Sequence, residues 1–217
     1  KEDFKDFIEA SGLLEYDPIT ISKIYRKNPQ RLLKRLWQTL IPIFAYILSV
    51  FWDKITGALK NKQQARFRAT QLTNLLVKLG PAFVKAGQAL STRPDIIPVV
   101  LLEELSQLQD QLPGFSGDKA MELIEEDLKK KINDIFLTID KEPISAASLG
   151  QVHKAILKNG DCVAVKVQRP GLREQITLDL YIVRNIAIWL KNNIGLIRSD
   201  LVALIDELGK RVFEEMD

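Results

Sequence analysis

Lys166 is the first residue whose type and position suggest chemistry, because it interrupts an otherwise strand-like stretch, CVAVKVQ at 162–168. Side chains alternate between the two faces of a strand, so Lys166 shares one face with Ala164 and Gln168, and the valines share the other. An ammonium group in a half-buried strand loses hydration and needs a partner. The small side chain of Ala164 leaves room for a flat ring beside the backbone, with Lys166 reaching toward phosphates.

The segment before this strand, SAASLGQ at 145–151, has the composition of a loop that crosses a phosphate chain. Its side chains are small, and its backbone N–H groups are available to phosphate oxygens. Asn159-Gly160 is a strong hairpin signal that joins QVHKAILK to CVAVKVQ. The order of strand, small-residue loop, strand, tight turn and lysine strand is typical of the start of a protein-kinase N-lobe. The alternative is an ordinary edge hairpin whose lysine extends into water.

Helical patterns flank this hairpin on both sides and must position it. Apolar spacing predicts helices over about 63–79, 81–93, 98–111 and 117–130 before the strands, and over 172–190 and 199–217 after them. Gly80 ends the first of these helices and Pro81 begins the second. The order of helices, small antiparallel sheet and helices predicts an α+β fold. We divide the chain into a basic and apolar helical segment (1–61), a helical extension (62–131) and a lobe containing the sheet (132–217).

Three motifs in this order resemble those of the UbiB/AarF family of atypical kinase-like proteins. They are KAGQ at 85–88, SAASLGQVH at 145–153 followed by VAVKVQRPG at 163–171, and EMD at 215–217. They resemble the family's KxGQ motif, its alanine-rich loop with the nucleotide lysine, and its ExD motif. The resemblance covers most of the chain from about Lys62 onward. It departs from the family pattern at Ser145, which stands where the usual AAAS loop has its first alanine.

The resemblance implies a helical KxGQ extension packed on a protein-kinase-like N-lobe that binds ATP or ADP with Mg²⁺. It implies catalytic roles for Lys85, Lys166 and Glu215, with Glu215 engaging one of the two lysines. It implies nucleotide contacts for Ala146, Ala147, Ser148, Val152, Ala164 and Lys166, regulatory roles for Lys85, Gln88 and Asp217, and no metal-ligating residue. Family members are implicated in isoprenoid quinone biosynthesis, and their stiffer alanine loop changes nucleotide preference.

Charge is distributed unevenly, with a net +13 on residues 18–94 and a net −6 on residues 95–217. Such a basic block suits an anionic surface, either outside the molecule or on its own second half. The apolar run LIPIFAYILSVFW at 40–52 has thirteen residues, and a helix needs about 20 to span a hydrocarbon core. Basic residues beside aromatic ones therefore predict peripheral contact with lipid headgroups, on a cytoplasmic or organellar membrane. The alternative is that this run packs into the protein's own core.

The expected partners are a nucleotide and a membrane surface, or lipid- or quinone-pathway proteins. Nucleic acid is not expected, because the basic block has few interleaved aromatic residues and no reading motif. His153, the single histidine, is predicted to be structural or exposed, and Cys162 cannot form an internal disulfide. An ordinary protein-kinase N-lobe and a non-catalytic membrane adaptor are the rival interpretations. We interpret the chain as a piece of a longer protein. The sequence given contains no HRD-like catalytic loop and no DFG-like metal-binding aspartate, so we expect no ATP turnover from this piece alone.

Overall fold

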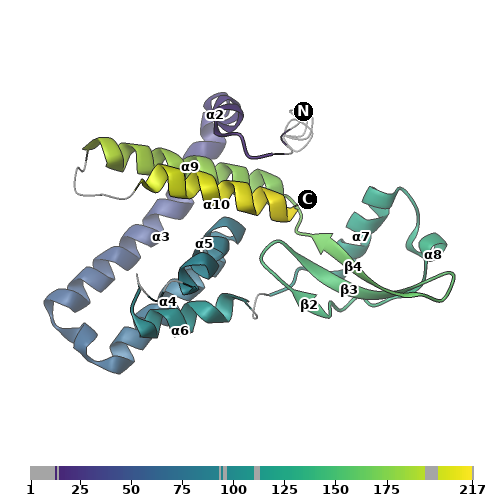
Figure 1. Ribbon diagram of the computed structural model, residues 1–217, viewed down its shortest axis with the longest axis horizontal. Helices are drawn as coiled ribbons and strands as arrows, with labels where there is room; N and C mark the ends of the chain where they lie inside the picture. Colours follow the sequence, from purple (N-terminus) through teal and green to yellow (C-terminus); the bar gives the residue numbers. More distant parts are fainter. Residues whose placement is uncertain are drawn as a thin grey trace.

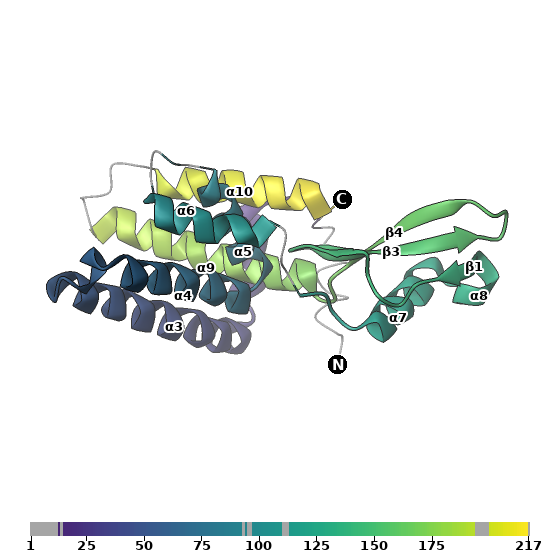
Figure 2. The ribbon, with the colours of Figure 1, turned by 90° about the horizontal axis from the view of Figure 1, so that it is seen from below.

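The computed structural model describes residues 13, 15–92, 94, 97–109, 113–193 and 200–216, which form a helical body joined to a smaller β lobe (Figures 1 and 2). The helical body comprises α2 (Pro18–Arg26), α3 (Pro29–Ile55), η1 (Ala58–Lys60), α4 (Lys62–Leu79), α5 (Pro81–Ser91), α6 (Val99–Ser106), η2 (Gln107–Gln109), α9 (Leu172–Asn193) and α10 (Leu201–Met216). The β lobe comprises α7 (Gly117–Leu128), α8 (Ile132–Ile135), β1 (Phe136–Ile139), β2 (Ser145–Ala146), β3 (Gly150–Leu157) and β4 (Cys162–Gln168). The predicted α+β class is confirmed.

The sheet of the β lobe is built around β3. Among the described residues it has four strands, and β3 pairs antiparallel with β1, β2 and β4. The predicted turn at Asn159-Gly160 joins β3 to β4, and Gly160 adopts a φ of 93°, which glycine tolerates best. Helix α7 covers one face of the sheet, where Ala120 and Ile124 pack with Phe136, Ala155 and Val167. The valine face of β4 is therefore the core face of the lobe.

The helical body is closed by α9 and α10, which lie antiparallel to each other in Figure 1. Their apolar stripes pack against α2, and Tyr25, Ile176 and Phe213 are almost completely buried in this core. Gly80 separates α4 from α5 with a φ of 114°, and Pro81 is the first residue of α5, as the sequence predicted. The two helices can therefore turn sharply and pack side by side.

The packing of the helices differs from the predicted division of the chain. Helix α7, placed in the predicted extension at 62–131, packs on the sheet. Helices α9 and α10, placed in the predicted lobe at 132–217, pack with α2 and α5 in the helical body. The predicted division grouped each helix with its neighbours along the chain. In the structure, the apolar faces of these helices pack against elements that lie elsewhere in the sequence.

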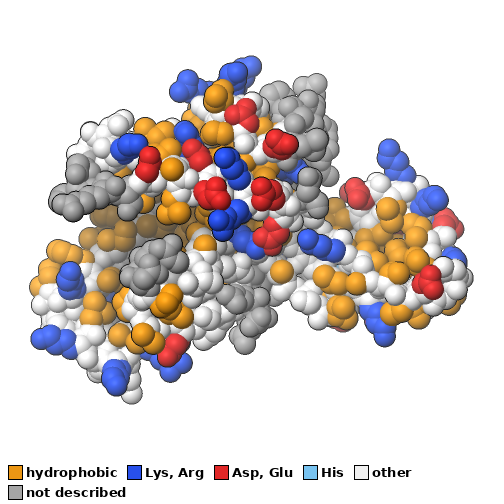
Figure 3. Space-filling model, viewed as in Figure 1, with side chains coloured by type: hydrophobic (Ala, Val, Ile, Leu, Met, Phe, Trp, Pro, Cys, Tyr) orange, Lys and Arg blue, Asp and Glu red, His pale blue; other side chains and the backbone are white. Residues whose placement is uncertain are grey.

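Helix α3 is longer and more exposed than the sequence suggested. It runs over 27 residues, and by length and composition alone it could cross a membrane. The interpretation that residues 40–52 pack into the core is wrong, because most of this run faces outward. Its outer stripe, at least half exposed at each position, consists of Trp37, Ile41, Phe44, Leu48, Phe51 and Ile55. Figure 3 shows orange hydrophobic side chains near this edge of the helical body.

Candidate functional site

The register of β3 and β4 brings three of the predicted nucleotide residues onto one face of the sheet. Val152 lies directly opposite Lys166, and Lys154 lies opposite Ala164. Residues directly opposite each other in an antiparallel pair point to the same face, so Val152, Ala164 and Lys166 form one surface. This surface is the face opposite α7, and Lys154 adds a second ammonium group to it.

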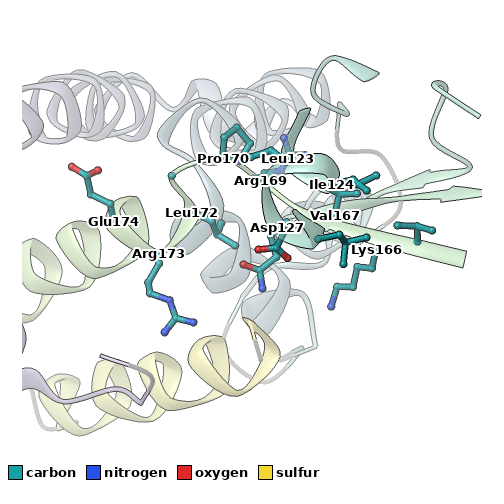
Figure 4. A pocket seen from close by; sticks show the side chains of 14 residues that line it. Leu123, Ile124, Asp127, Lys166, Val167, Arg169, Pro170, Leu172, Arg173 and Glu174 are labelled. Atoms are coloured by element: carbon teal, nitrogen blue, oxygen red, sulfur yellow. The ribbon is translucent and has the colours of Figure 1, made fainter. Parts of the chain in front are cut away.

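Lys166 itself is exposed, so the prediction of a half-buried lysine is wrong for the described structure. Its ammonium group makes no ion pair or hydrogen bond with any described residue. The physical reason is that α7 packs on the valine face, while the lysine face of β4 has no comparable helix among the described elements. Figure 4 shows the side chain of Lys166 extending away from the valine face. The cation is therefore available to a ligand.

A cavity of about 470 Å³ lies where β4 leaves the sheet, and Lys166 belongs to its lining. The other lining residues come from the rest of β4 and the connection after it, from the end of α7, including Ile124 and Asp127, and from the beginning of α9, including Arg173 (Figure 4). No described residue of the 145–150 loop lines this cavity. The structure therefore does not place Lys166 and the alanine loop around one enclosed space.

Arg169 hydrogen-bonds to the backbone of the loop at 145–150, which we call the alanine loop. The sequence analysis did not select this arginine. The Nε of Arg169 donates to the carbonyl oxygens of Ala147 (3.2 Å) and Ser148 (3.1 Å), and its Nη2 donates to Ala147 (2.9 Å) and Pro113 (2.7 Å). Desolvation lowers the pKa of Arg169. Because the guanidinium fixes two loop carbonyls, it also fixes the peptide planes that carry the loop's N–H groups. The only sequence signal for this role was its place just after the lysine strand.

Gly150 allows the loop to approach β4 closely. A Cβ atom at this position would lie 2.5 Å from the carbonyl oxygen of Val167, which no side chain tolerates without a backbone shift. Of the predicted loop residues, Ser148 is buried, Ala146 is half-buried and Ala147 is exposed. Ala146 lies opposite Gln151 and therefore does not share the face of Lys166.

The KAGQ motif and Glu215 meet within the helical body. The ammonium group of Lys85 on α5 contacts both carboxylate oxygens of Glu215 on α10, so Glu215 engages one of its two predicted partners. Gln88 instead donates to the carbonyl of Leu108 at 2.8 Å. A Cβ atom on Gly87 would lie 2.7 Å from Leu108, so glycine permits the close packing of α5. The functional roles of these residues remain predictions, and Asp217 lies outside the described residues.

His153 belongs to a buried polar network next to the loop. Its Nε2 lies 3.0 Å from the amide nitrogen of Gln151, and its Nδ1 lies 2.8 Å from the carbonyl of Asp140. The other side-chain atom of Gln151, Oε1, accepts from the backbone of Phe115 at 2.8 Å. These contacts agree with the structural role predicted for His153. Within the described residues, no group of three or more His, Cys, Asp or Glu side chains is placed to hold a metal ion.

Comparison with known proteins gives one family. A sequence model described as the ABC1 atypical kinase-like domain matches residues 107–217. The uncharacterized Synechocystis protein sll0005 is 50% identical over 203 residues, which cover 94% of this chain and 30% of that protein. An Arabidopsis thaliana protein, named as an uncharacterized chloroplastic aarF domain-containing protein kinase, is 46% identical over 211 residues, covering 96% of this chain and 30% of the relative.

A solved structure is also similar in sequence. The complex of Rv3197 with erythromycin from Mycobacterium tuberculosis shares 32% identity, with a TM-score of 0.42, over 76% of this chain and 41% of that one. The present chain spans about a third of the length of the two relatives above.

Proposed function

This chain belongs to the ABC1 atypical kinase-like family, as its motifs predicted, and from this premise we propose that it forms the nucleotide-binding N-terminal part of an ATP-dependent atypical kinase or ATPase. The observation that carries the proposal is the shared face of β3 and β4, where Val152 and Ala164 lie beside the unpaired ammonium group of Lys166. An apolar and a small side chain accommodate a flat base, and the lysine attracts the phosphates.

The other predicted residues have defined places in this proposal. In this proposal Ala147 and Ser148 contribute contacts at the phosphate end, with their backbone oriented by Arg169, whereas Ala146 lies on the other face of the sheet. Magnesium is carried by the bound ATP or ADP, so that its charge offsets the phosphates. The pair of Lys85 and Glu215 joins α5, which carries the KxGQ motif, to α10 within the helical body.

Nucleotide-dependent thermal stabilisation of the chain tests this proposal. We expect ADP or ATP with Mg²⁺, at about 100 times its Kd, to add about 2.7 kcal/mol of stability. For a chain of this size that corresponds to a rise in Tm of about 5–10 °C. Lys166→Ala should abolish most of the shift, whereas Lys158→Ala, in the exposed turn of the same hairpin, should leave it unchanged. Equal shifts in both variants would show that Lys166 does not bind the nucleotide.

We extend the proposal to a membrane surface, on the basis of the outer stripe of α3. This stripe is apolar, and the basic residues Arg26, Lys27, Arg31, Lys34 and Lys54 lie at its ends. The opposite side of α3 packs against α4 and α9, which leaves the outer face for lipid. A helix in that position lies along the headgroup region, with its cations near anionic phosphates.

Flotation with vesicles of phosphatidylcholine and phosphatidylglycerol tests the membrane contact. We expect the chain to float with these vesicles, and to do so less at high salt. The double variant Phe44→Asp/Phe51→Asp should remain in the unbound fraction. The matched control is Leu204→Asp, which places the same charge at an exposed apolar position on α10. If the control loses binding equally, α3 is not the contact.

These two experiments also separate the rival functions. Vesicle binding that survives Lys166→Ala, without any nucleotide-dependent shift, would favour a non-catalytic membrane adaptor. The family resemblance extends the proposal to isoprenoid quinone biosynthesis. In that case, loss of the full-length protein should lower the quinone content of its source cells, and the Lys166→Ala form should fail to restore it.

A further inference from the structure

A second cavity, of about 340 Å³, lies between the helical body and the alanine loop. We call it the junction cavity, because residues from both parts of the molecule line it. Its lining residues are Val77, Lys78, Gly80, Pro81, Val84, Pro113, Phe115, Ser148, Arg169, Pro170 and Gln175. Lys166, Val152 and Ala164 are not among them, so the junction cavity differs from the face on which we place the nucleotide, although Ser148 of the alanine loop borders both.

The charged side chains that line the junction cavity in the described part of the chain are both positive. Among the described residues, Lys78 and Arg169 line it, and no aspartate or glutamate does. Neither cation forms an ion pair with a described residue. The hydrogen bonds of Arg169 use only its Nε and Nη2 atoms and end on neutral carbonyl oxygens. Its Nη1 group therefore has two N–H donors without an acceptor in the described part of the chain, and its charge has no counter-ion there.

Ser148 provides an independent sign of a polar ligand. The residue is only 4% exposed and lines the cavity, yet its hydroxyl has no hydrogen-bond partner among the described residues. The hydroxyl oxygen is not sealed from solvent, so it faces the cavity and is free to bond a ligand oxygen there. Gly80 and Pro81, at the positive end of the α5 dipole, line the same cavity and favour an anion there.

The rest of the lining is apolar and includes one aromatic ring. Val77, Val84 and Phe115 lie in the wall, and the guanidinium of Arg169 lies 6.0 Å from the centre of the Phe115 ring. A volume of this size is at the small end of ligand sites, and suits a molecule of about one ring. A bare inorganic ion would leave these apolar walls without contacts.

We propose that the junction cavity binds a small organic anion, whose carboxylate or phosphate lies against Arg169, Ser148 and Lys78 and whose apolar body packs against Phe115 and Val77. Such a ligand would touch α4, the start of α5 and the alanine loop together. It would thus link the KxGQ extension to the loop that we assign to the nucleotide. The site does not depend on nucleotide binding, so it can be tested separately.

Fluorine NMR of the intact chain tests this inference with simple probes. We expect 4-fluorobenzoate to show saturable line broadening, and the neutral isostere 4-fluorobenzamide to show none. A third probe, 4-fluorophenyl phosphate, distinguishes a phosphate ligand from a carboxylate ligand by its relative affinity. Equal broadening with the amide, or broadening that does not saturate, would overturn the proposal.

Matched variants locate the binding. Lys78→Glu should weaken binding of the preferred probe about tenfold, because it reverses a charge at the cavity. Lys62→Glu makes the same change near the beginning of α4, about 24 Å along the helix, and should have little effect. Val77→Phe should block the cavity, with circular dichroism confirming that the variant is folded. Equal losses in both lysine variants, or a loss in Lys166→Ala, would overturn the assignment.

Discussion

The ion pair between Arg35 and Asp179 gives the sharpest prediction about what holds the helical body together. Arg35 on α3 donates from Nε to one carboxylate oxygen of Asp179 on α9 (2.6 Å) and from Nη2 to the other (2.8 Å). The same Nη2 donates to the carbonyl of Leu79, at the end of α4. The side chain of Asp179 is 0% exposed and that of Arg35 is 16% exposed. Three helices therefore meet at one bidentate, largely desolvated pair.

Removing one partner of this pair should be costly. Asp179→Ala leaves a buried guanidinium with a single carbonyl acceptor, and such losses cost about 3–5 kcal/mol. Because Arg35 retains some exposure and the Leu79 carbonyl, we expect about 3 kcal/mol, or a fall in Tm of about 6–12 °C. Replacing both partners with apolar residues, in Arg35→Met/Asp179→Leu, should instead leave stability within about 1 kcal/mol of the starting protein.

Urea denaturation followed by far-ultraviolet circular dichroism measures these differences. The matched control is Glu174→Ala, which removes a partly exposed carboxylate from the same helix, paired with Arg31, and should cost less than about 1 kcal/mol. The reasoning is refuted if Asp179→Ala costs no more than this control. It is also refuted if the apolar double variant is as unstable as Asp179→Ala, because packing and not desolvated charge would then explain the loss.

Three further changes are predicted. A double-mutant cycle to alanine at Lys85 and Glu215 should give a coupling of only about 0.5–1 kcal/mol, because the glutamate is half exposed; zero coupling would mean that the contact does not hold α5 to α10. Thr39→Val should raise stability by about 1 kcal/mol in thermal unfolding, because the buried Thr39 hydroxyl has no hydrogen-bond partner among the described residues; a loss would contradict this. Hydrogen bonds from Arg68 lower the pKa of Asp53, so the ionised carboxylate stabilises the folded chain above about pH 4, and this stabilisation is lost as the pH falls through the lower native pKa. Asp53→Asn should therefore flatten the acid dependence of the unfolding free energy, and an unchanged pH profile would contradict this.

The hairpin at the centre of the lobe could be predicted from sequence because its signals are local. Alternation in CVAVKVQ predicted the two faces of β4, and Asn159-Gly160 predicted the position of the turn. The register that sets Val152 opposite Lys166 came only from the structure, because a two-residue turn at 159–160 would set His153 there. The Gly80-Pro81 boundary was also predictable from local signals. The contact of Lys85 with Glu215 was different, because it joins residues 130 positions apart and came only from the family resemblance.

Other features depend on contacts that no local pattern encodes. The exposure of Lys166 depends on which face of the sheet α7 covers. The amphipathic pattern of α7 predicts an apolar face but does not indicate which surface that face packs against. From the sequence, the apolar run of α3 was compatible both with the protein core and with a membrane surface. An apolar run shows that its side chains prefer to leave water, but not what covers them. The role of Arg169 depends on carbonyl oxygens of the loop and of Pro113. Every residue has a backbone carbonyl, so residue types do not indicate which ones accept a hydrogen bond from this arginine.

The position of Arg169 also bears on how the two parts of the molecule could form one site. The chain enters the β lobe near Pro113 and leaves it through Arg169-Pro170-Gly171, and Arg169 ties these two connections together. Lys85 and Glu215 lie in the helical body, whereas Lys166 lies in the β lobe, and no described residue of α5 or α10 lines the cavity beside Lys166. The relative placement of these groups therefore depends on the joint at Arg169 and on Gln168 of β4, whose side-chain amide donates to the carbonyl of Met216 on α10. Because the junction cavity opens at this same joint, the anion proposed there would contact both Arg169 and Lys78 of α4, and so link the β lobe to the helical body.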